Sequence, residues 1–155
     1  MKARLDDIDW KILRELQGDG RVTNVELARR VGISAPPCLR RVRSLEEAGI
    51  IREYRAILDE KQLGYELTAF AMVGLVSQAE ADLIAFEKRI REWSIVRECY
   101  MQSGEVDFLL KCVATDLPAF QDFVIGELTA TPNVESVRTS LTIRQIKASP
   151  GVPIG

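Results

Sequence analysis

The sequence of 155 residues contains no histidine. This absence excludes Ser-His and Cys-His nucleophile pairs and every zinc site that depends on an imidazole ligand. The cysteines form no CxxC pair, and their odd number argues against a disulfide framework, so we expect reduced and partly buried thiols. We predict no catalytic residues, no metal and no bound cofactor. The three cysteines are Cys38, Cys99 and Cys112.

Long apolar segments are also missing. The longest nearly apolar run is AFAMVGLV, residues 69–76, which is much shorter than the roughly 20 residues that a membrane-spanning helix needs. The N-terminal MKARLDDIDW reaches acidic residues at once and lacks the apolar core of a secretory signal. These features predict a cytoplasmic protein that does not bind a membrane.

The chain has little net charge, −2 from 21 basic and 23 acidic side chains. Net charge averages over the whole chain, however, whereas binding to nucleic acid responds to a local patch. Residues 27–45 contain five arginines and no acid. The positive charge therefore concentrates in one segment, which keeps DNA as a candidate partner. The five are Arg29, Arg30, Arg40, Arg41 and Arg43.

Two short helices are predicted at the start of the chain. Apolar residues recur at helical spacing in residues 5–16, with charged residues between them, which predicts an amphipathic helix. The segment QGDGR then turns the chain. Thr23 and Glu26 have the spacing of a capping box, so a second helix begins there and ends at Gly32.

A third helix is predicted to begin at two adjacent prolines. Ser34 can cap it, which puts Pro36 and Pro37 in the first turn, where backbone N–H groups have no intrahelical partner to lose. Gly49 suits the left-handed residue that follows a helix. Residues at i, i+4 and i+7 form the buried stripe of this helix, namely Cys38, Val42 and Leu45.

After this helix, the sequence IIREYRAIL, residues 50–58, is typical of extended, hairpin-like chain. Three short helices with a tight turn between the second and third, followed by a strand pair, describe a winged helix-turn-helix. We therefore predict a DNA-binding domain in residues 1–60 and a polar linker in residues 61–66.

The hydrophobic pattern changes in residues 67–155. Apolar and alternating segments predict strands, and two segments with helical spacing interrupt them, in the order strand, helix, strand, strand, helix, strand. This order is the split βαβ arrangement of ferredoxin-like domains. The predicted fold class is α+β, with an N-terminal winged helix-turn-helix and a C-terminal ferredoxin-like βαββαβ domain.

The exposed side of the third helix is the predicted DNA-binding surface. A helix-turn-helix presents the start of its second helix to base edges in the major groove, where arginine pairs with guanine. We expect Arg40 to contact bases, and we expect phosphate contacts from Arg41, Arg43, Arg52 and Arg55. An isolated arginine-rich helix is more often merely solvated, but the neighbouring helix, turn and wing favour DNA. The predicted contacts are Ser34, Ala35, Pro36, Leu39, Arg40, Arg41, Arg43, Arg52 and Arg55.

The loop QSGEVDF between two predicted strands is a weaker candidate site. Gly104 permits close approach of the backbone to a ligand, and Asp107 can accept hydrogen bonds from an ammonium group. A glycine and an aspartate at such a place more often form an ordinary hairpin turn. The residues alone leave both interpretations open.

Together these segments resemble the Lrp/AsnC family of transcriptional regulators. The opening helix of the family is similar to LDDIDWKILRELQGDGR. Its helix-turn-helix and wing are similar to VELARRVGISAPPCLRRVRSLEEAGIIREYRAILD, and its effector domain is similar to SGEVDFLLKCVATDLPAFQDFV. The resemblance covers nearly the whole chain. It implies a regulator that binds double-stranded DNA and forms a homodimer, with dimers assembling to a tetramer or octamer.

The resemblance also implies a small effector, frequently an amino acid, bound by the second domain between dimers. The family's effector loop is matched here by Ser103, Gly104 and Asp107. Thr139 and Ser140, on the last predicted strand, match small polar residues of the family near that region.

Two other functions fit parts of the sequence. Siroheme decarboxylases are similar to this family in both domains, but they rely on histidines near the tetrapyrrole, and this chain has none. A stand-alone amino-acid sensing module would use its first domain only for protein contacts. The arginine-rich helix favours a DNA-binding regulator that is not an enzyme.

Overall fold

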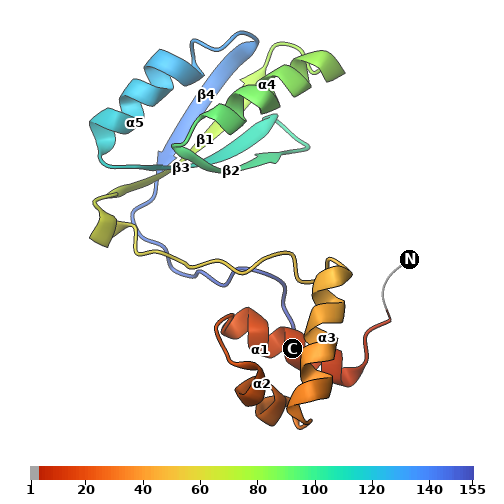
Figure 1. The fold of residues 1–155 in the computed structure, drawn as a ribbon. Coiled ribbons are helices and arrows are strands. Elements are labelled where there is room, and N and C mark those ends of the chain that lie inside the picture. The colour runs from red at the N-terminus through yellow and green to blue at the C-terminus, as the bar shows by residue number, and fades with distance from the viewer. Residues whose placement is uncertain (1–3) are drawn as a thin grey trace. The chain divides into compact units, whose positions relative to one another are not determined.

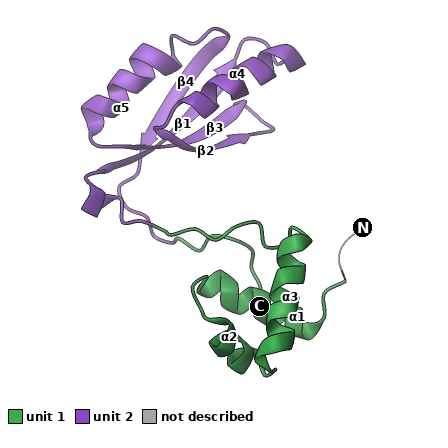
Figure 2. Cartoon of the chain, viewed as in Figure 1, with its two compact units in different colours: residues 1–57, 148–155 green, residues 58–147 purple. Residues whose placement is uncertain are grey.

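A computed structural model describes residues 4–155 (Figure 1). The chain folds into two compact units, which Figure 2 distinguishes by colour. Unit 1 consists of residues 1–57 and 148–155, and unit 2 consists of residues 58–147. Among residues 4–155, no helix has both the length and the apolar composition that crossing a membrane requires.

Unit 1 is a bundle of three helices: α1 (Asp7–Gly18), α2 (Asn24–Val31) and α3 (Ala35–Glu47). The apolar faces predicted from the sequence meet in its centre, and the stripe of α3 contributes two fully buried residues together with Val42 at the edge. Burial of these faces holds together helices that are too short to be stable in isolation. The buried residues are Ile12, Leu13, Leu27, Ala28, Val31, Cys38 and Leu45.

The predicted helix boundaries are confirmed in unit 1. The hydroxyl of Thr23 accepts a hydrogen bond from the backbone N–H of Glu26 at 3.2 Å, which caps α2. Gly32 and Gly49 follow α2 and α3 with φ angles of 80° and 70°, a left-handed conformation that costs glycine little. The second half of the predicted capping box is replaced, because the side chain of Glu26 pairs with arginines instead.

The start of α3 confirms the position of the two prolines but corrects the role of Ser34. Ser34 occupies the N-cap position, yet its side chain makes no capping hydrogen bond. A cap accepts from the N–H of the second or third helical residue, and here those residues are Pro36 and Pro37, which have no N–H. The prolines therefore remove the donors that a serine cap would satisfy.

The predicted strand pair after α3 was wrong. The backbone N–H groups of Ile50 and Ile51 both bond to the carbonyl of Leu45, at 3.0 and 3.1 Å, and close the helix end. Residues 52–59 then run on without forming a strand. The segment alternates in polarity but contains no Asn-Gly or Gly-Gly turn to reverse its direction, so it has no second strand to pair with.

Unit 2 has the predicted order of elements. A short 3-10 turn (Lys61–Leu63) precedes an antiparallel sheet of order β2-β3-β1-β4, and a π-helical turn (Val124–Leu128) extends α5. The ferredoxin-like prediction is thereby confirmed. The other elements are β1 (Leu67–Leu75), α4 (Glu80–Glu92), β2 (Val96–Met101), β3 (Phe108–Ala114), α5 (Leu117–Phe123) and β4 (Val134–Leu141).

The core of unit 2 lies between the sheet and the two helices, which cover the same face of the sheet (Figure 1). Alternate residues of β3 are buried, as expected for a strand with one covered face. Phe86 of α4 packs on Phe108 of β3, with ring centroids 4.9 Å apart. At the far end of α4, Trp93 is also buried, and its indole N–H donates to Glu127 at 2.8 Å.

The division of the chain differs from the predicted domains 1–60 and 67–155. Unit 2 begins at residue 58, and the last eight residues return to unit 1. The physical reason for the return is that Ile154 packs against the apolar core of the three helices. A single apolar residue in a Pro- and Gly-containing tail gives no periodic signal, so the sequence did not reveal this contact.

Candidate DNA interface and effector region

The turn between α2 and α3 is held by a side chain that the sequence did not single out. Asn24, the first residue of α2, donates from Nδ2 to the carbonyl of Ala35 at 2.9 Å. Its Oδ1 is buried and forms no hydrogen bond with any residue in the described range 4–155. This contact joins the first turn of α3 to the start of α2.

Beyond that turn, the predicted DNA-contacting residues of α3 differ in exposure. Ser34, Pro36, Arg40 and Arg43 are exposed, and 38% of Leu39 is accessible. Ala35 and Arg41 are only partly accessible. The exposed group lies on the side of α3 opposite the buried Cys38 and Leu45.

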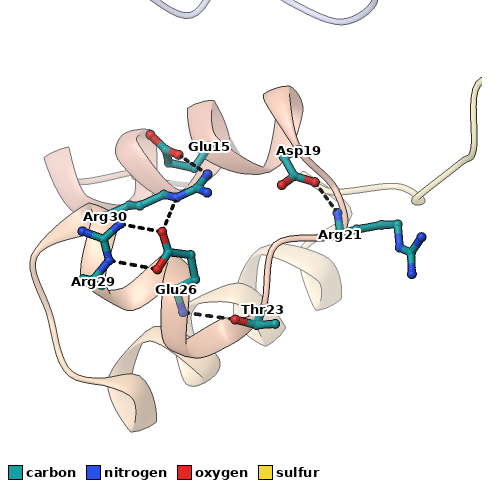
Figure 3. Close-up of polar contacts among 7 residues, drawn as sticks. All are labelled: Glu15, Asp19, Arg21, Thr23, Glu26, Arg29 and Arg30. Carbon is teal, nitrogen blue, oxygen red and sulfur yellow. Dashed lines mark hydrogen bonds and ion pairs between the residues drawn. The ribbon is translucent and has the colours of Figure 1, made fainter.

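Three of the five clustered arginines are neutralised by acids outside the cluster. Figure 3 shows the carboxylate of Glu26 between two of them, with Arg29 Nη2 at 2.6 Å and Arg30 Nε at 2.9 Å. Arg30 also reaches Glu15 on α1 at 3.2 Å. Hydrogen bonds from Arg29 and Arg30 lower the pKa of Glu26 to about 2. This network ties α2 to α1.

Arg41 is the third neutralised arginine. Its Nη1 lies 2.8 Å from Asp6 Oδ2 and 2.7 Å from Asp9 Oδ1, at the start of α1. The pKa of Asp6 is lowered, first by the hydrogen bond from the backbone N–H of Asp9 and next by Arg41. Arg41 therefore joins α3 to α1, a role that differs from the predicted phosphate contact.

The remaining predicted arginines keep their charge available to a ligand. Within the described residues, Arg40, Arg43 and Arg52 form no ion pair with any acid. Arg55 pairs with Glu53 at 2.8 Å, and 76% of its side chain is accessible. Among the arginines predicted to contact DNA, three guanidinium groups are thus unpaired within residues 4–155, and that of Arg55 is weakly held.

In unit 2, the predicted effector loop is a hairpin between β2 and β3. The N–H of Gln102 donates to the carbonyl of Asp107 at 2.9 Å and closes it, and Gly104 has a φ of 136°, which favours glycine. The Oδ2 of Asp107 accepts from the N–H of Leu75 at 2.6 Å. Ser103 lies exposed in the same loop. Asp107 thus holds the end of β1 through Oδ2, and its Oδ1 accepts no hydrogen bond from another residue in the range 4–155.

Thr139 and Ser140 lie elsewhere on the sheet. They are on β4, an edge strand, and pair with Ala71 and Phe70 of β1. Because β1 separates β4 from β3, they are two strand spacings away from the hairpin, roughly 10 Å across the sheet. One protomer therefore does not bring Thr139 and Ser140 together with the loop that contains Asp107.

A second asparagine that the sequence analysis missed fixes the loop after β1. Asn133 has a φ of 72°, and its amide bonds both backbone groups of Ser77: Oδ1 accepts at 2.8 Å, and Nδ2 donates at 2.9 Å. The Asn in a Thr-Pro-Asn turn was the available signal, because asparagine tolerates left-handed backbone. This contact supports the same end of β1 as Asp107.

A hollow of about 430 Å³ lies between α4 and β2. Its lining includes charges of both signs and a floor of apolar side chains. None of the predicted effector residues lines it. The lining residues are Glu87, Ile90, Arg91, Val96, Arg97, Glu98, Cys99, Met101 and Phe108.

The cysteines are free thiols within cores, as predicted. Burial raises the pKa of Cys112 to about 12 and, together with the nearby Glu87, that of Cys99 to about 11. Burial also raises the pKa of Cys38. Thiols of this kind are protonated at neutral pH and are poor nucleophiles.

Two family models match the chain. The one described as winged helix-turn-helix DNA-binding matches residues 5–52, and the one described as Lrp/AsnC ligand binding domain matches residues 68–152. The first covers the three helices of unit 1, and the second covers the sheet and both helices of unit 2.

Curated relatives match over nearly their full length. A leucine-responsive regulatory protein of Rhizobium meliloti (strain 1021) is 67% identical over 147 residues, which cover 95% of this chain and 94% of the relative. The transcriptional regulator AzlB of Bacillus subtilis (strain 168) is 38% identical over 154 residues, 99% of this chain and 98% of the relative.

Solved structures of transcriptional regulators also match the chain over nearly its full length. A transcriptional regulator from Neisseria meningitidis, crystallised as an L-Met complex, matches with a TM-score of 0.93 and 39% identity over 97% of both chains. AsnC of Escherichia coli matches with a TM-score of 0.87 and 26% identity, over 97% of this chain and 100% of the other.

Proposed function

Because the chain belongs to the Lrp/AsnC family of transcriptional regulators, we propose that it recognises its operator with the exposed side of α3 and that an amino acid bound to unit 2 adjusts this recognition. Unit 1 is the DNA-binding domain of the regulator and unit 2 its ligand-binding domain. The observation that supports the proposal most is the division of the arginines into neutralised and unpaired ones.

Arg40 is the proposed base-reading residue. It is exposed, lies on the side of α3 away from the core, and has no acidic partner within residues 4–155. An unpaired guanidinium can give two hydrogen bonds to O6 and N7 of a guanine. The surface around Arg40 that would enter the major groove is formed by Ser34, Ala35, Pro36 and Leu39.

Arg43 and Arg52 are the proposed phosphate contacts. Both have free charge, and Arg55 joins them because an exposed pair such as Arg55 with Glu53 is held by only about 0–1 kcal/mol and exchanges readily for a phosphate. Arg41 is proposed to act indirectly, by holding α3 in place through Asp6 and Asp9, rather than by contacting DNA.

The proposed effector is an amino acid. Ser103, Gly104 and Asp107 form one half of its site, and the free Oδ1 of Asp107 would accept hydrogen bonds from the ammonium group. Thr139 and Ser140 form the other half. Since one protomer keeps the halves roughly 10 Å apart, a site that uses both requires a second chain. This separation supports a homodimer that assembles further to a tetramer or octamer.

The L-Met complex of the Neisseria meningitidis regulator supports an amino acid as the ligand class. The relatives are named as transcriptional regulators, and we propose no catalytic role for this chain. A regulator that acts on the bacterial chromosome works in the cytoplasm, where we place this protein.

The DNA-binding proposal is tested by selecting duplexes from a random pool and measuring their affinities. Arg40→Ala should relax preference at one or two positions by about 1–3 kcal/mol, or roughly 5- to 150-fold. Arg29→Ala is the matched control, because Arg29 is also exposed but is neutralised by Glu26. Unchanged sequence preference in Arg40→Ala would remove Arg40 from the proposed readout.

The effector proposal is tested by thermal unfolding in the presence of each of the 20 amino acids, since a ligand that binds only the folded state raises the midpoint. Asp107→Asn should abolish the shift, because the amide still accepts from Leu75 but no longer attracts an ammonium group. Glu105→Gln, in the same exposed loop, is the control. The absence of a shift with every amino acid would refute the amino-acid effector.

A further inference from the structure

The last residues of the chain are bound to α1 by a single amide side chain. Gln17 Nε2 donates to the carbonyl of Val152 at 2.7 Å, and Gln17 Oε1 accepts from the N–H of Val152 at 3.0 Å. Both backbone groups of one residue are therefore satisfied by one side chain, as a neighbouring strand would satisfy them. The contact joins positions that are 135 residues apart in the sequence.

Gly151 is required for this approach in two independent ways. Its φ is 99°, a conformation that L side chains rarely adopt. In addition, a Cβ at this position would overlap the amide of Gln17, with Cδ only 2.7 Å away. A larger residue at position 151 would therefore strain the backbone and displace the Gln17 amide from its two hydrogen bonds with Val152.

Ile154 anchors the end of the tail. Its side chain is partly buried and packs on the apolar cluster of the three helices. By contrast, 59% of the Val152 side chain is exposed, so this residue is held through its backbone alone. The tail combines two hydrogen bonds from Gln17 of α1, a glycine with positive φ, and an apolar side chain on the core of the three helices.

Without the tail, unit 1 would be connected to unit 2 only through residues 52–59. Within this connection, the Tyr54 hydroxyl donates to Glu46 of α3 at 2.8 Å. Beyond Tyr54 the chain is irregular, and 84% of Ile57 is exposed. A single irregular connection lets a domain rotate about it, whereas a second connection restrains that rotation.

We propose that residues 148–155 are a strap that docks noncovalently on α1 and, by giving each DNA-binding unit a second connection to the ligand-binding unit, limits the spacing of DNA half-sites that a dimer can engage. Residues 142–147 connect the end of β4 to the strap. The inference rests on the proposed dimeric binding to DNA. Paired domains gain affinity only when their connections let both sites be reached at once.

Docking itself is tested by hydrogen exchange of the full-length protein. The N–H of Val152 should exchange slowly in the wild type and fast in Gln17→Ala, Gly151→Val and Ile154→Asp. Val152→Ala is the matched control, since it keeps both backbone hydrogen bonds to Gln17 and should retain the protection. Equal exchange in the wild type and in Gln17→Ala would overturn the docking, whether or not the protein binds DNA.

The role in spacing is tested with duplexes that contain two half-sites, moved stepwise through one helical turn of about 10.5 base pairs. The wild type should lose at least about tenfold in affinity half a turn away from its best spacing, and Gly151→Val and Ile154→Asp less than about threefold. Affinity for a single half-site should stay unchanged in all of them.

The outcomes separate the strap from the proposed function. If the wild type binds no duplex, the DNA-binding proposal fails, and the exchange experiment still decides whether the tail docks. If the wild type binds but both strap variants keep its spacing profile, the strap does not limit spacing. If the variants lose single half-site binding as well, the tail is only a part of the fold of unit 1, which also overturns the inference.

Discussion

The contrast between Arg41 and Arg43 offers a direct test of how unit 1 meets DNA. Both are arginines on α3, two residues apart, and the sequence predicted phosphate contacts for both. In the structure, Arg41 is held by Asp6 and Asp9 at 2.8 and 2.7 Å, whereas Arg43 is exposed and forms no ion pair with an acid among residues 4–155. Replacing each by alanine should therefore give two different phenotypes.

The magnitude for Arg43→Ala follows from counterion release. Each phosphate contact contributes about 0.9 to the slope of log affinity against log salt, so a dimer that loses two contacts should lose about 1.8. At 0.1 M salt, the loss of one contact corresponds to roughly eightfold in affinity. Because the side chain is exposed and unpaired, the midpoint of thermal unfolding should not change.

Arg41→Ala should behave in the opposite way. Its removal leaves Asp6 and Asp9 without their partner across unit 1, so the midpoint of thermal unfolding should fall. The salt slope should stay within about 0.3 of the wild type, because a guanidinium that is already neutralised contributes little to counterion release.

Fluorescence anisotropy with one labelled duplex, titrated at four or five salt concentrations, measures both slopes, and scanning calorimetry measures both midpoints. Arg43→Lys is the control for Arg43→Ala, since it keeps the charge and should keep the slope. The reasoning is refuted if Arg41→Ala lowers the salt slope as much as Arg43→Ala does, because the ion pairs to Asp6 and Asp9 would then be exchanged for phosphates on binding.

Three further predictions concern stability. In chemical denaturation, Ser34→Ala should leave the unfolding free energy nearly unchanged, whereas Thr23→Ala should lower it by about 1 kcal/mol. The reason is that the Thr23 side chain accepts a hydrogen bond from a backbone N–H and the Ser34 side chain does not. Equal losses in the two variants would contradict this assignment. The pKa of Glu26, lowered from 4.5 to about 2, means that its ion pairs stabilise the fold above pH 4.5 and are lost as the pH falls toward 2. The midpoints of Glu26→Gln should therefore fall less steeply over that range than those of the wild type, and parallel curves would argue against the pairing. Phe86→Ala, which empties a position with 2% exposure in the core of unit 2, should cost about 3–5 kcal/mol in calorimetry of the full chain, and a loss below about 1 kcal/mol would show that the site collapses.

Much of the fold was predictable because its signals are local. The helical spacing of residues 5–16, the cap at Thr23 and the left-handed glycines at positions 32 and 49 each act within a few residues, and the structure confirms them. The order of strands and helices in unit 2 was equally readable from the period of its apolar residues. The predicted cap at Ser34 was wrong because Pro36 and Pro37, its neighbours in the sequence, have no N–H for the serine to accept.

The candidate site was predictable in its location but not in its division of roles. The sequence identified an arginine-rich helix and could not tell which arginines are free, because Arg30 and Arg41 have acidic partners that lie 15 and 35 residues away. Asn24 was overlooked for the same reason, since its importance comes from a carbonyl 11 residues further on.

The sequence by itself determined the three-helix unit, the βαββαβ unit and the arginine-rich third helix, because periodicity and capping depend on neighbours along the chain. Only the tertiary structure decided that Arg41 is neutralised, that Thr139 and Ser140 lie apart from the loop of Asp107 within one protomer, and that Gln17 holds Val152. These contacts join residues that are distant in the chain, and nothing in their local spacing depends on the partner that folding brings to them.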